Sequence, residues 1–384
     1  MTLSHNPQGL EPQVPRTPVA AEGRPHSEPR RRSRRRGAEI GLALLSILAF
    51  ASALALAEKL ARRWFPAPDI RTSIDELHTY SEVYGWELRK AQRFDFDGHK
   101  TTINAKGYRG PEVPSQKAHR RVLVLGDSIS FGVDVSDDQT FSHLLQTKRS
   151  DLEVANLAVP GYGPDQQLIK LEREGIALVP DVVIVGACLS NDLADATLGT
   201  FLYDDRHPKP FYRLEAGRLV KYDSHLELPW RSRLTLFLTE HSRLYQIVVS
   251  PRGRGDGPKS ATDHWLYRRK AALKDRAPVV ELTARLWGRM AELSRDAGAS
   301  FVILAFPEDD SYASRSPWLD ELAASPPLRG VTIVDMGQRL RDKGFAFENV
   351  AADTLGHLSP SGHQVTADIV QDVLAEKGFA TSAN

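Results

Sequence analysis

The stretch RVLVLGDSIS, residues 121–130, begins like a buried strand and stops at Gly126, Asp127 and Ser128. Four apolar residues precede Gly126, and no ordinary turn sequence follows it. A serine that opens a helix lies among free backbone N–H groups and at the positive end of the helix dipole. These features stabilise the anion that forms when a serine attacks a carbonyl group. Ser128 is therefore a candidate nucleophile, and the alternative is a plain N-cap serine.

Five apolar runs of strand length occur along the chain, each followed by loop and helix-like sequence. Strands that alternate with helices predict a parallel sheet with helices on both faces. In such sheets, ligands bind at the carboxyl ends of the strands, where Ser128 falls. Apolar residues at helical spacing predict a helix from Val279 to Leu293 and a last helix that Ser359 caps. The five runs are Arg121–Gly126, Glu153–Ala158, Asp181–Ala187, Phe301–Phe306 and Val331–Met336.

We expect Ser128 itself to open a helix on the carboxyl side of the first strand. Apolar residues that follow it can line the inner face of this helix: Phe131, Phe141, Leu144 and Leu145.

Two further motifs follow the second and third strands. NLAVPGYG, residues 156–163, contains Gly161, where the backbone can approach a ligand closely and donate an N–H. LSNDLAD, residues 189–195, contains Asn191, whose side chain can donate an N–H. Each motif alone fits a turn or a helix cap, but both fall on the same edge of the predicted sheet as Ser128.

The motif DTLGHLSPSGH, residues 353–363, precedes the last helix. His357 can act as a general base, and Asp353 can orient it. A metal site formed by Asp353, His357 and His363 is the chemical alternative. Their spacing matches no standard zinc pattern, so we predict no metal and no cofactor.

With these four motifs, the sequence resembles the SGNH (GDSL-like) hydrolase family over about residues 100–378. The resemblance implies a flavodoxin-like three-layer α/β/α fold with a five-stranded parallel sheet. It also implies that Ser128 is the nucleophile, His357 the base and Asp353 the acid of a catalytic triad. The oxyanion hole would then consist of the Ser128 N–H, the Gly161 N–H and the Asn191 side chain.

The sequence departs from the family pattern at two positions. The family has its acid three residues before the histidine, where this chain has Thr354, and Leu189 replaces a glycine two residues before the asparagine. Ser130 replaces the closing glycine of the G-x-S-x-G elbow, which argues against an α/β-hydrolase fold. We expect an Asp353 oxygen within about 3.2 Å of His357 Nδ1. The alternative is a Ser-His dyad in which a backbone carbonyl orients the histidine.

The charge of the 384-residue chain is uneven. Residues 1–36 contain eight arginines and three glutamates, so they carry +5 and the rest of the chain carries −4. A nucleic-acid-binding protein would carry basic residues on its folded domain, so we expect no nucleic-acid partner. Six prolines and no aromatic residue in the same segment predict a disordered, basic cytoplasmic tail. The single cysteine, Cys188, allows no internal disulfide.

An uncharged apolar run, Ile40–Ala57, reaches the lower length limit of a membrane span. Six arginines closely precede it, which places the N-terminus in the cytoplasm and the body outside. We interpret residues 37–65 as an uncleaved signal-anchor helix in an inner membrane, with the remainder on the periplasmic side. A signal peptide cleaved after Ala57 is the alternative.

After the anchor, the sequence of residues 66–120 predicts short strands and loops that form a stalk or a cap. This segment contains no recognisable catalytic or binding motif. Residues 121–384 form the expected catalytic domain. Residues 199–275 interrupt its strand-helix alternation with a hairpin and an amphipathic helix from Leu234 to Val248. This insert is placed either to cover the site as a lid or to fill space by packing.

Three functions fit these observations. The first is an exported, membrane-anchored serine esterase acting on a small acyl ester, such as an acetyl group on a glycan. The second is an O-acyltransferase that passes the acyl group to a cell-envelope polysaccharide, because both reactions share one acyl-enzyme. The third is an inactive envelope scaffold or binding protein, against which the complete set of catalytic residue types argues.

Overall fold

The chain divides into two compact units, residues 1–61 and residues 62–384, which are considered separately. Residues 1–28 of the predicted tail lie outside the described part of the chain, as does Thr354. The computed structural model describes residues 29–65, 70–71, 76–96, 98–189, 191–203, 207–223, 234, 237–238, 242–249, 260–307, 316–353 and 356–379.

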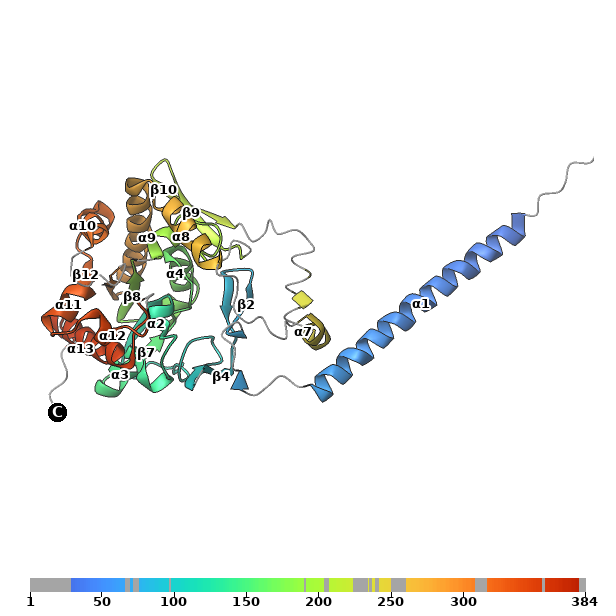
Figure 1. Ribbon diagram of the computed structural model, residues 1–384, viewed down its shortest axis with the longest axis horizontal. Helices are drawn as coiled ribbons and strands as arrows, with labels where there is room; N and C mark the ends of the chain where they lie inside the picture. The colour runs from blue at the N-terminus through green and yellow to red at the C-terminus, as the bar shows by residue number, and fades with distance from the viewer. Residues whose placement is uncertain are drawn as a thin grey trace, which may run out of the picture. The chain divides into compact units, whose positions relative to one another are not determined.

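The described part of the first unit is a long helix, α1, Pro29–Trp64, whose last residues, Arg62–Trp64, belong to the second unit (Figure 1). Its segment Gly37–Trp64 has a mean hydropathy of 2.4 in its most apolar window and is long enough to cross a membrane. Large apolar side chains along this segment, such as Leu42 and Phe50, are exposed. The structure therefore contains the apolar N-terminal helix that the sequence predicts, but the helix begins at Pro29, inside the segment that was predicted to be disordered.

The second unit is built on a five-stranded parallel sheet with the order β12-β11-β8-β6-β7. In sequence order this is 2-1-3-4-5, the flavodoxin-like arrangement. All five predicted strands are confirmed, with bounds that differ by one or two residues. The strands are β6 Arg120–Gly126, β7 Leu152–Asn156, β8 Val182–Cys188, β11 Ser300–Phe306 and β12 Thr332–Asp335.

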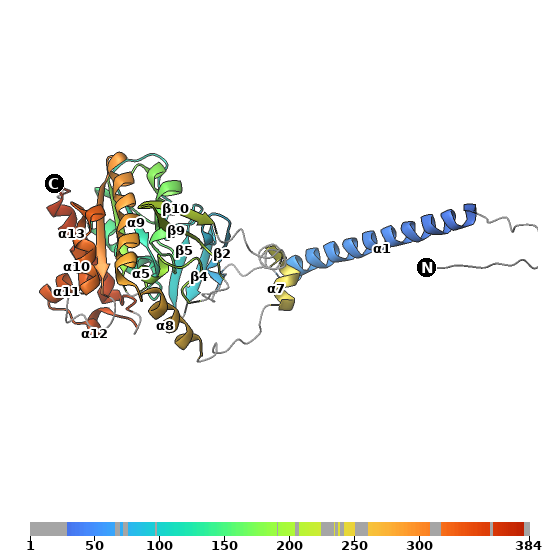
Figure 2. The same cartoon turned by 90° about the horizontal axis from the view of Figure 1, so that it is seen from above.

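Helices cover both faces of this sheet (Figure 2). Neighbouring strand residues enter different cores, as in β6, where Leu123 packs in one hydrophobic cluster and Val122 in another. The predicted three-layer α/β/α fold is thus confirmed. One face is covered by α4, Pro164–Lys170, and α9, Arg276–Asp296, and the other by α3, Phe141–Lys148, and α13, Pro360–Glu376.

The helix predicted to begin at Ser128 is confirmed, but its predicted length is wrong. Helix α2, Ser128–Phe131, makes one turn and ends at Gly132, which has a φ of 85°. A separate helix, α3, begins after Thr140, whose side chain accepts the His143 N–H. Because of this break, the expected residues do not share one helix face: Phe131 lies in α2, and Phe141, Leu144 and Leu145 lie in α3.

The segment before the sheet contains short strands, as the sequence predicts. It joins the central sheet at Arg109, which forms an antiparallel bridge with Asn156 at the end of β7. The Arg109 N–H donates to the Asn156 carbonyl at 3.0 Å. The segment is therefore part of the folded body. Its strands are β1 Ile70–Arg71, β2 His78–Ser81, β3 Gly85–Leu88, β4 Gln92–Phe96 and β5 His99–Ile103.

The predicted hairpin of the insert is also confirmed. Strands β9, Pro210–Glu215, and β10, Arg218–Asp223, pair in antiparallel fashion around Ala216 and Gly217. Both turn residues have positive φ values, which are typical of a two-residue hairpin turn. Of the helix predicted from Leu234 to Val248, the structure describes α7, and parts of the remainder lie outside the described residues. The other helices are α5 Asp192–Asp195, α7 Arg243–Val249, α8 Ser260–Ala272, α10 Pro317–Ala324, α11 Met336–Asp342 and α12 Phe347–Val350.

Candidate active site

Ser128 lies at the carboxyl end of β6, as predicted, and it is half-buried. The preceding Asp127 is the N-cap of α2, and its carboxylate accepts the Ile129 N–H at 3.0 Å. Gly126 has a φ of 144°, and a Cβ at this position would collide with the Ser130 side chain. A glycine is therefore needed for the chain to leave the strand and present the Ser128 hydroxyl at the start of a helix.

His357 bridges the serine and an acid. Its Nε2 lies 2.8 Å from Ser128 Oγ, and its Nδ1 lies 2.7 Å from Asp353 Oδ2. The predicted Asp353–His357 distance is confirmed. The one-residue departure from the family spacing is accommodated in a loop where Gly356 has a φ of 86°. In addition, the His357 N–H donates to Asp353 Oδ1 at 3.1 Å, so both carboxylate oxygens contact this histidine.

A second carboxylate, Asp134, also faces the histidine. Asp134 Oδ2 lies 3.4 Å from His357 Nδ1, on the same side of the ring as Asp353. Asp134 follows the one-turn helix α2 in a loop without hydrophobic periodicity. No sequence pattern connects this loop with the motif around His357, and we did not expect Asp134 in the site.

These two acids change the acid-base behaviour of His357. Burial lowers the pKa of the imidazole, but the hydrogen bonds and negative charges of Asp134 and Asp353 more than offset this effect. The pKa of His357 is raised from its ordinary value of 6.5 to about 10. The imidazolium form is therefore strongly stabilised, which is what an orienting acid must do when the histidine accepts a proton.

The two predicted oxyanion residues follow the neighbouring strands. Gly161, after β7, has a φ of 81°, and a Cβ at this position would contact the Phe201 ring at 2.6 Å. Asn191, after β8, is 5% exposed, and its Nδ2 donates to Asp127 Oδ2 at 3.2 Å. This hydrogen bond fixes the orientation of the amide and leaves its second Nδ2 hydrogen for another acceptor. The oxyanion roles of both residues stay predictions.

The segment before the sheet supports the site, although its sequence shows no chemistry. The Trp86 indole N–H donates to the Pro160 carbonyl at 3.2 Å, next to Gly161. The buried Arg109 guanidinium donates to the carbonyls of Phe131 and Val135, at 2.8 and 2.6 Å. Hydrogen bonds from this segment therefore hold both loops of the site. The aromatic and basic residues are scattered along its sequence, so they form no pattern from which this role could be predicted.

The alternative metal site, formed by Asp353, His357 and His363, is not present in the described part of the structure, because His363 lies apart from the other two residues. His363 is buried in the first turn of α13, and its Nδ1 accepts the Phe141 N–H at 3.1 Å. Burial lowers its pKa to about 3. Within the described residues, Asp134 lies beside Asp353 and His357, and His363 does not join that group.

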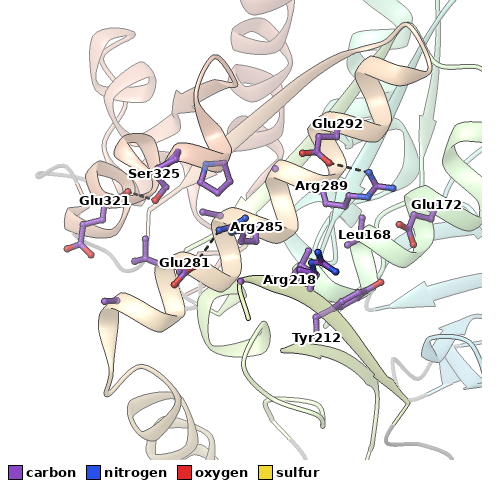
Figure 3. A pocket seen from close by; sticks show the side chains of 18 residues that line it. Leu168, Glu172, Tyr212, Arg218, Glu281, Arg285, Arg289, Glu292, Glu321 and Ser325 are labelled. Carbon is purple, nitrogen blue, oxygen red and sulfur yellow. Dashed lines mark hydrogen bonds and ion pairs between the residues drawn. The ribbon is translucent and has the colours of Figure 1, made fainter. Parts of the chain in front are cut away.

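A cavity of about 950 Å³ lies along α9 (Figure 3). Its walls come from the β9-β10 hairpin and the end of α10, and its rim carries ion pairs within the helix, Glu281–Arg285 and Arg289–Glu292. None of the predicted catalytic or oxyanion residues lines it. No histidine is among the lining residues, so Ser325, the serine that lines the cavity, has no imidazole base there, whereas Ser128 lies 2.8 Å from His357 Nε2. The candidate reaction site is therefore at Ser128.

No family model matches the sequence, and no curated protein matches it. Solved structures do. The chain is similar to structures of the G-D-S-L lipolytic family. A putative member from Desulfitobacterium hafniense is 12% identical, with 67% of this chain and 100% of that chain covered and a TM-score of 0.33. A member from Veillonella parvula is 12% identical, with coverages of 67% and 98% and a TM-score of 0.37. A variant of an acetyl-xylooligosaccharide esterase from Geobacillus is 12% identical, with coverages of 71% and 100% and a TM-score of 0.38. At these values the function has to be argued from the geometry of the site.

Proposed function

We propose that this protein is a serine esterase that hydrolyses small acyl esters. The observation that carries the proposal is the continuous chain of contacts from Ser128 through His357 to Asp353. The serine lies at a helix N-terminus, the histidine is within hydrogen-bond reach of its hydroxyl, and an acid fixes the far nitrogen. This is the constellation that activates a serine for covalent catalysis.

The reaction would proceed in two halves. His357 Nε2 accepts the hydroxyl proton while Ser128 Oγ attacks the ester carbonyl, and a tetrahedral intermediate forms. When this intermediate collapses, the alcohol leaves with the proton from His357, and the acyl group stays on Ser128. Water then attacks the acyl-enzyme, with His357 again as base, and the carboxylic acid leaves from the regenerated serine.

The negative oxygen of each tetrahedral intermediate needs donors. The Ser128 N–H belongs to the first turn of α2, where backbone N–H groups have no partner within the helix. The Gly161 N–H and the Asn191 amide would complete the set. A buried amide held by Asp127 cannot reorient freely, and such preorganised donors are the ones that stabilise an oxyanion most.

The proposed location is outside the cytoplasm, with α1 as a single-pass anchor in the inner membrane. Six arginines immediately before the apolar segment and the length of Gly37–Trp64 support this topology. A catalytic body tethered there would meet the glycans of the cell envelope. Acetyl groups on such a glycan are accordingly the substrate class that we propose.

Removal of the nucleophile tests the proposal. We expect Ser128→Ala to reduce the hydrolysis of p-nitrophenyl acetate to the uncatalysed background, with unchanged thermal unfolding, because the hydroxyl is the attacking group. Ser130→Ala is the matched control, since Ser130 is a fully buried serine of the same motif. The Ser130 variant should retain activity. Full activity of the Ser128 variant would contradict the proposed function.

A further inference from the structure

Asp134 is a carboxylate that the proposed triad does not need. Its Oδ2 lies 3.4 Å from the His357 Nδ1 that already contacts Asp353 at 2.7 Å. The two carboxylates are similarly solvated, with 38% of the Asp134 side chain and 35% of the Asp353 side chain exposed. One imidazole N–H therefore faces two negatively charged groups of comparable exposure.

The loop that carries Asp134 is fixed on both sides. The N–H groups of Gly132 and Val133 donate to the Ser128 carbonyl at 2.9 and 3.3 Å, so the loop is bonded to the nucleophile residue itself. The side chain of Arg109 donates to the carbonyls of Gly132 and Val135. Arg109 is 4% exposed, so these hydrogen bonds are buried and shielded from water.

A carboxylate on a mobile surface loop would adopt many positions, and its contact with a histidine would be weak. Here Asp134 stands between residues whose backbone groups are held by Ser128 and Arg109. The position of Asp134 is set by the same hydrogen bonds that shape the turn after α2. The contact with His357 is therefore part of the architecture of the site.

We propose that Asp134 is a second positioning acid, which shares the His357 Nδ1 proton with Asp353 and tunes the pH at which His357 becomes a free base. The inference rests on the proposed function, because it concerns the base of that reaction. Two negative charges beside one imidazole favour the imidazolium, so the free base is available only at alkaline pH. The acid pair makes His357 a stronger base and moves the working range of the enzyme upward.

The pH dependence of His357 depends on every charged group that faces it. Asp353 and Asp134 contact Nδ1, and Ser128 contacts Nε2. Two buried groups on packed elements add smaller effects through space: Asp127 before α2 and His363 in α13. Of these groups, Asp134 can be altered without disturbing the N-cap of α2 or the core around α13.

The test compares full-chain variants in detergent micelles. We expect Asp134→Asn to move the acidic limb of the kcat/KM profile for p-nitrophenyl acetate by about one pH unit or more to lower pH. The ratio of the rate at pH 7 to the plateau rate should then increase about tenfold. Asp138→Asn is the matched control, because Asp138 is an exposed acid four residues further along, in the short 3-10 helix Asp137–Gln139, and its profile should superimpose on that of the wild type.

A second comparison uses the other acid. Asp353→Asn should lose less activity than the double variant Asp134→Asn/Asp353→Asn, because Asp134 still provides a carboxylate for Nδ1. Equal losses in the two variants would contradict a shared role. A profile of Asp134→Asn that superimposes on the wild type, with or without a lower thermal midpoint, would also overturn the inference.

A third measurement does not depend on catalysis. Histidine-selective NMR titration, with His357→Gln to assign the signal, should show a lower pKa for His357 in Asp134→Asn than in Asp138→Asn. If no variant hydrolyses the ester, the proposed function fails, and this titration still decides the inference. Identical His357 titration curves in the two variants would overturn it.

Discussion

Two groups of acids lie close to Ser128, and they differ in what surrounds them. The first group, Asp134 and Asp353, is about one-third exposed and faces the imidazole of His357. The second group follows β7 and β8 in the chain and is completely buried, and within the described residues Lys209 binds its Asp165 carboxylate. The second group consists of Asp165, Asp192 and Asp195.

The comparison shows how surroundings assign different tasks to the same side chain. Around His357, the acids hold a positive charge in place and raise the pKa of the base to about 10. In the buried group, burial raises the pKa values of the acids themselves, that of Asp195 to about 8. In the proposed function the first group serves acid-base chemistry, and we expect the second to be a structural network whose stability depends on protonation and on Lys209.

The largest effect should come from removal of the buried cation. Lys209 and Asp165 are both fully buried, and the Lys209 ammonium also donates to the Asp195 carbonyl at 3.0 Å. We expect Lys209→Met to lower the free energy of unfolding by about 3–5 kcal/mol, because it leaves a buried carboxylate without its partner. Chemical denaturation of the full chain measures this loss.

The matched control is Lys221→Met on the neighbouring hairpin. Lys221 pairs with Asp223 at 2.8 Å, with 32% and 39% of the two side chains exposed. A solvent-exposed pair contributes at most about 1 kcal/mol, so this variant should unfold almost like the wild type. Equal losses in the Lys209 and Lys221 variants would show that the buried network does not depend on its cation.

A smaller effect is expected from Asp195→Asn, and it depends on pH. The folded-state pKa of Asp195 is raised to about 8 from an ordinary value of 3.8, so the folded protein holds this proton more tightly than the unfolded chain. Its contribution to stability is present at low pH and is lost as the pH rises from about 4 to about 8. The free energy of unfolding of the variant should fall less steeply over this window.

His357 also makes the free energy of unfolding depend on pH, but over a higher pH range than Asp195. Its pKa is also raised, so its contribution to stability is lost between pH 6.5 and about 10. Above pH 8, Asp195→Asn should leave the slope of the stability curve unchanged, because Asp195 is ionised there in both the folded and the unfolded state. Asp296→Asn, an exposed acid at the end of α9, is the control. Parallel stability curves for Asp195→Asn and the wild type from pH 4 to pH 8 would contradict the assignment.

The sequence predicts the parts of the molecule that local patterns encode. Apolar runs of strand length located all five sheet strands, and the Ser359-Pro360 signal located the start of α13, where Ser359 accepts the Gly362 N–H. The geometry from Ser128 to Asp353 was also predictable, because each residue lies in a motif with its own chemical reason. The length of α2 was missed, although Gly132 ends the helix locally: it adopts a φ of 85°, and its N–H donates to the Ser128 carbonyl.

Polar contacts between residues that are distant in the sequence could not be predicted from it. Asp134 meets His357 only because the fold brings the loop after α2 to the last loop before α13. No pattern in the sequence marks Lys209 and Asp165 as buried, because lysine and aspartate are seldom fully buried. Arg109 likewise gave no sign that its guanidinium holds the turn after α2. Charged pairs across distant segments carry no periodicity that could reveal them.

The central claim is that Ser128 is a nucleophile activated by His357. Treatment of the full chain with a fluorophosphonate, followed by peptide mapping with mass spectrometry, tests it most directly. We predict one adduct on Ser128 in the wild type, faster labelling as the pH rises toward 10, and no adduct at this position in His357→Gln. An unlabelled Ser128, or equal labelling with and without His357, would contradict the account.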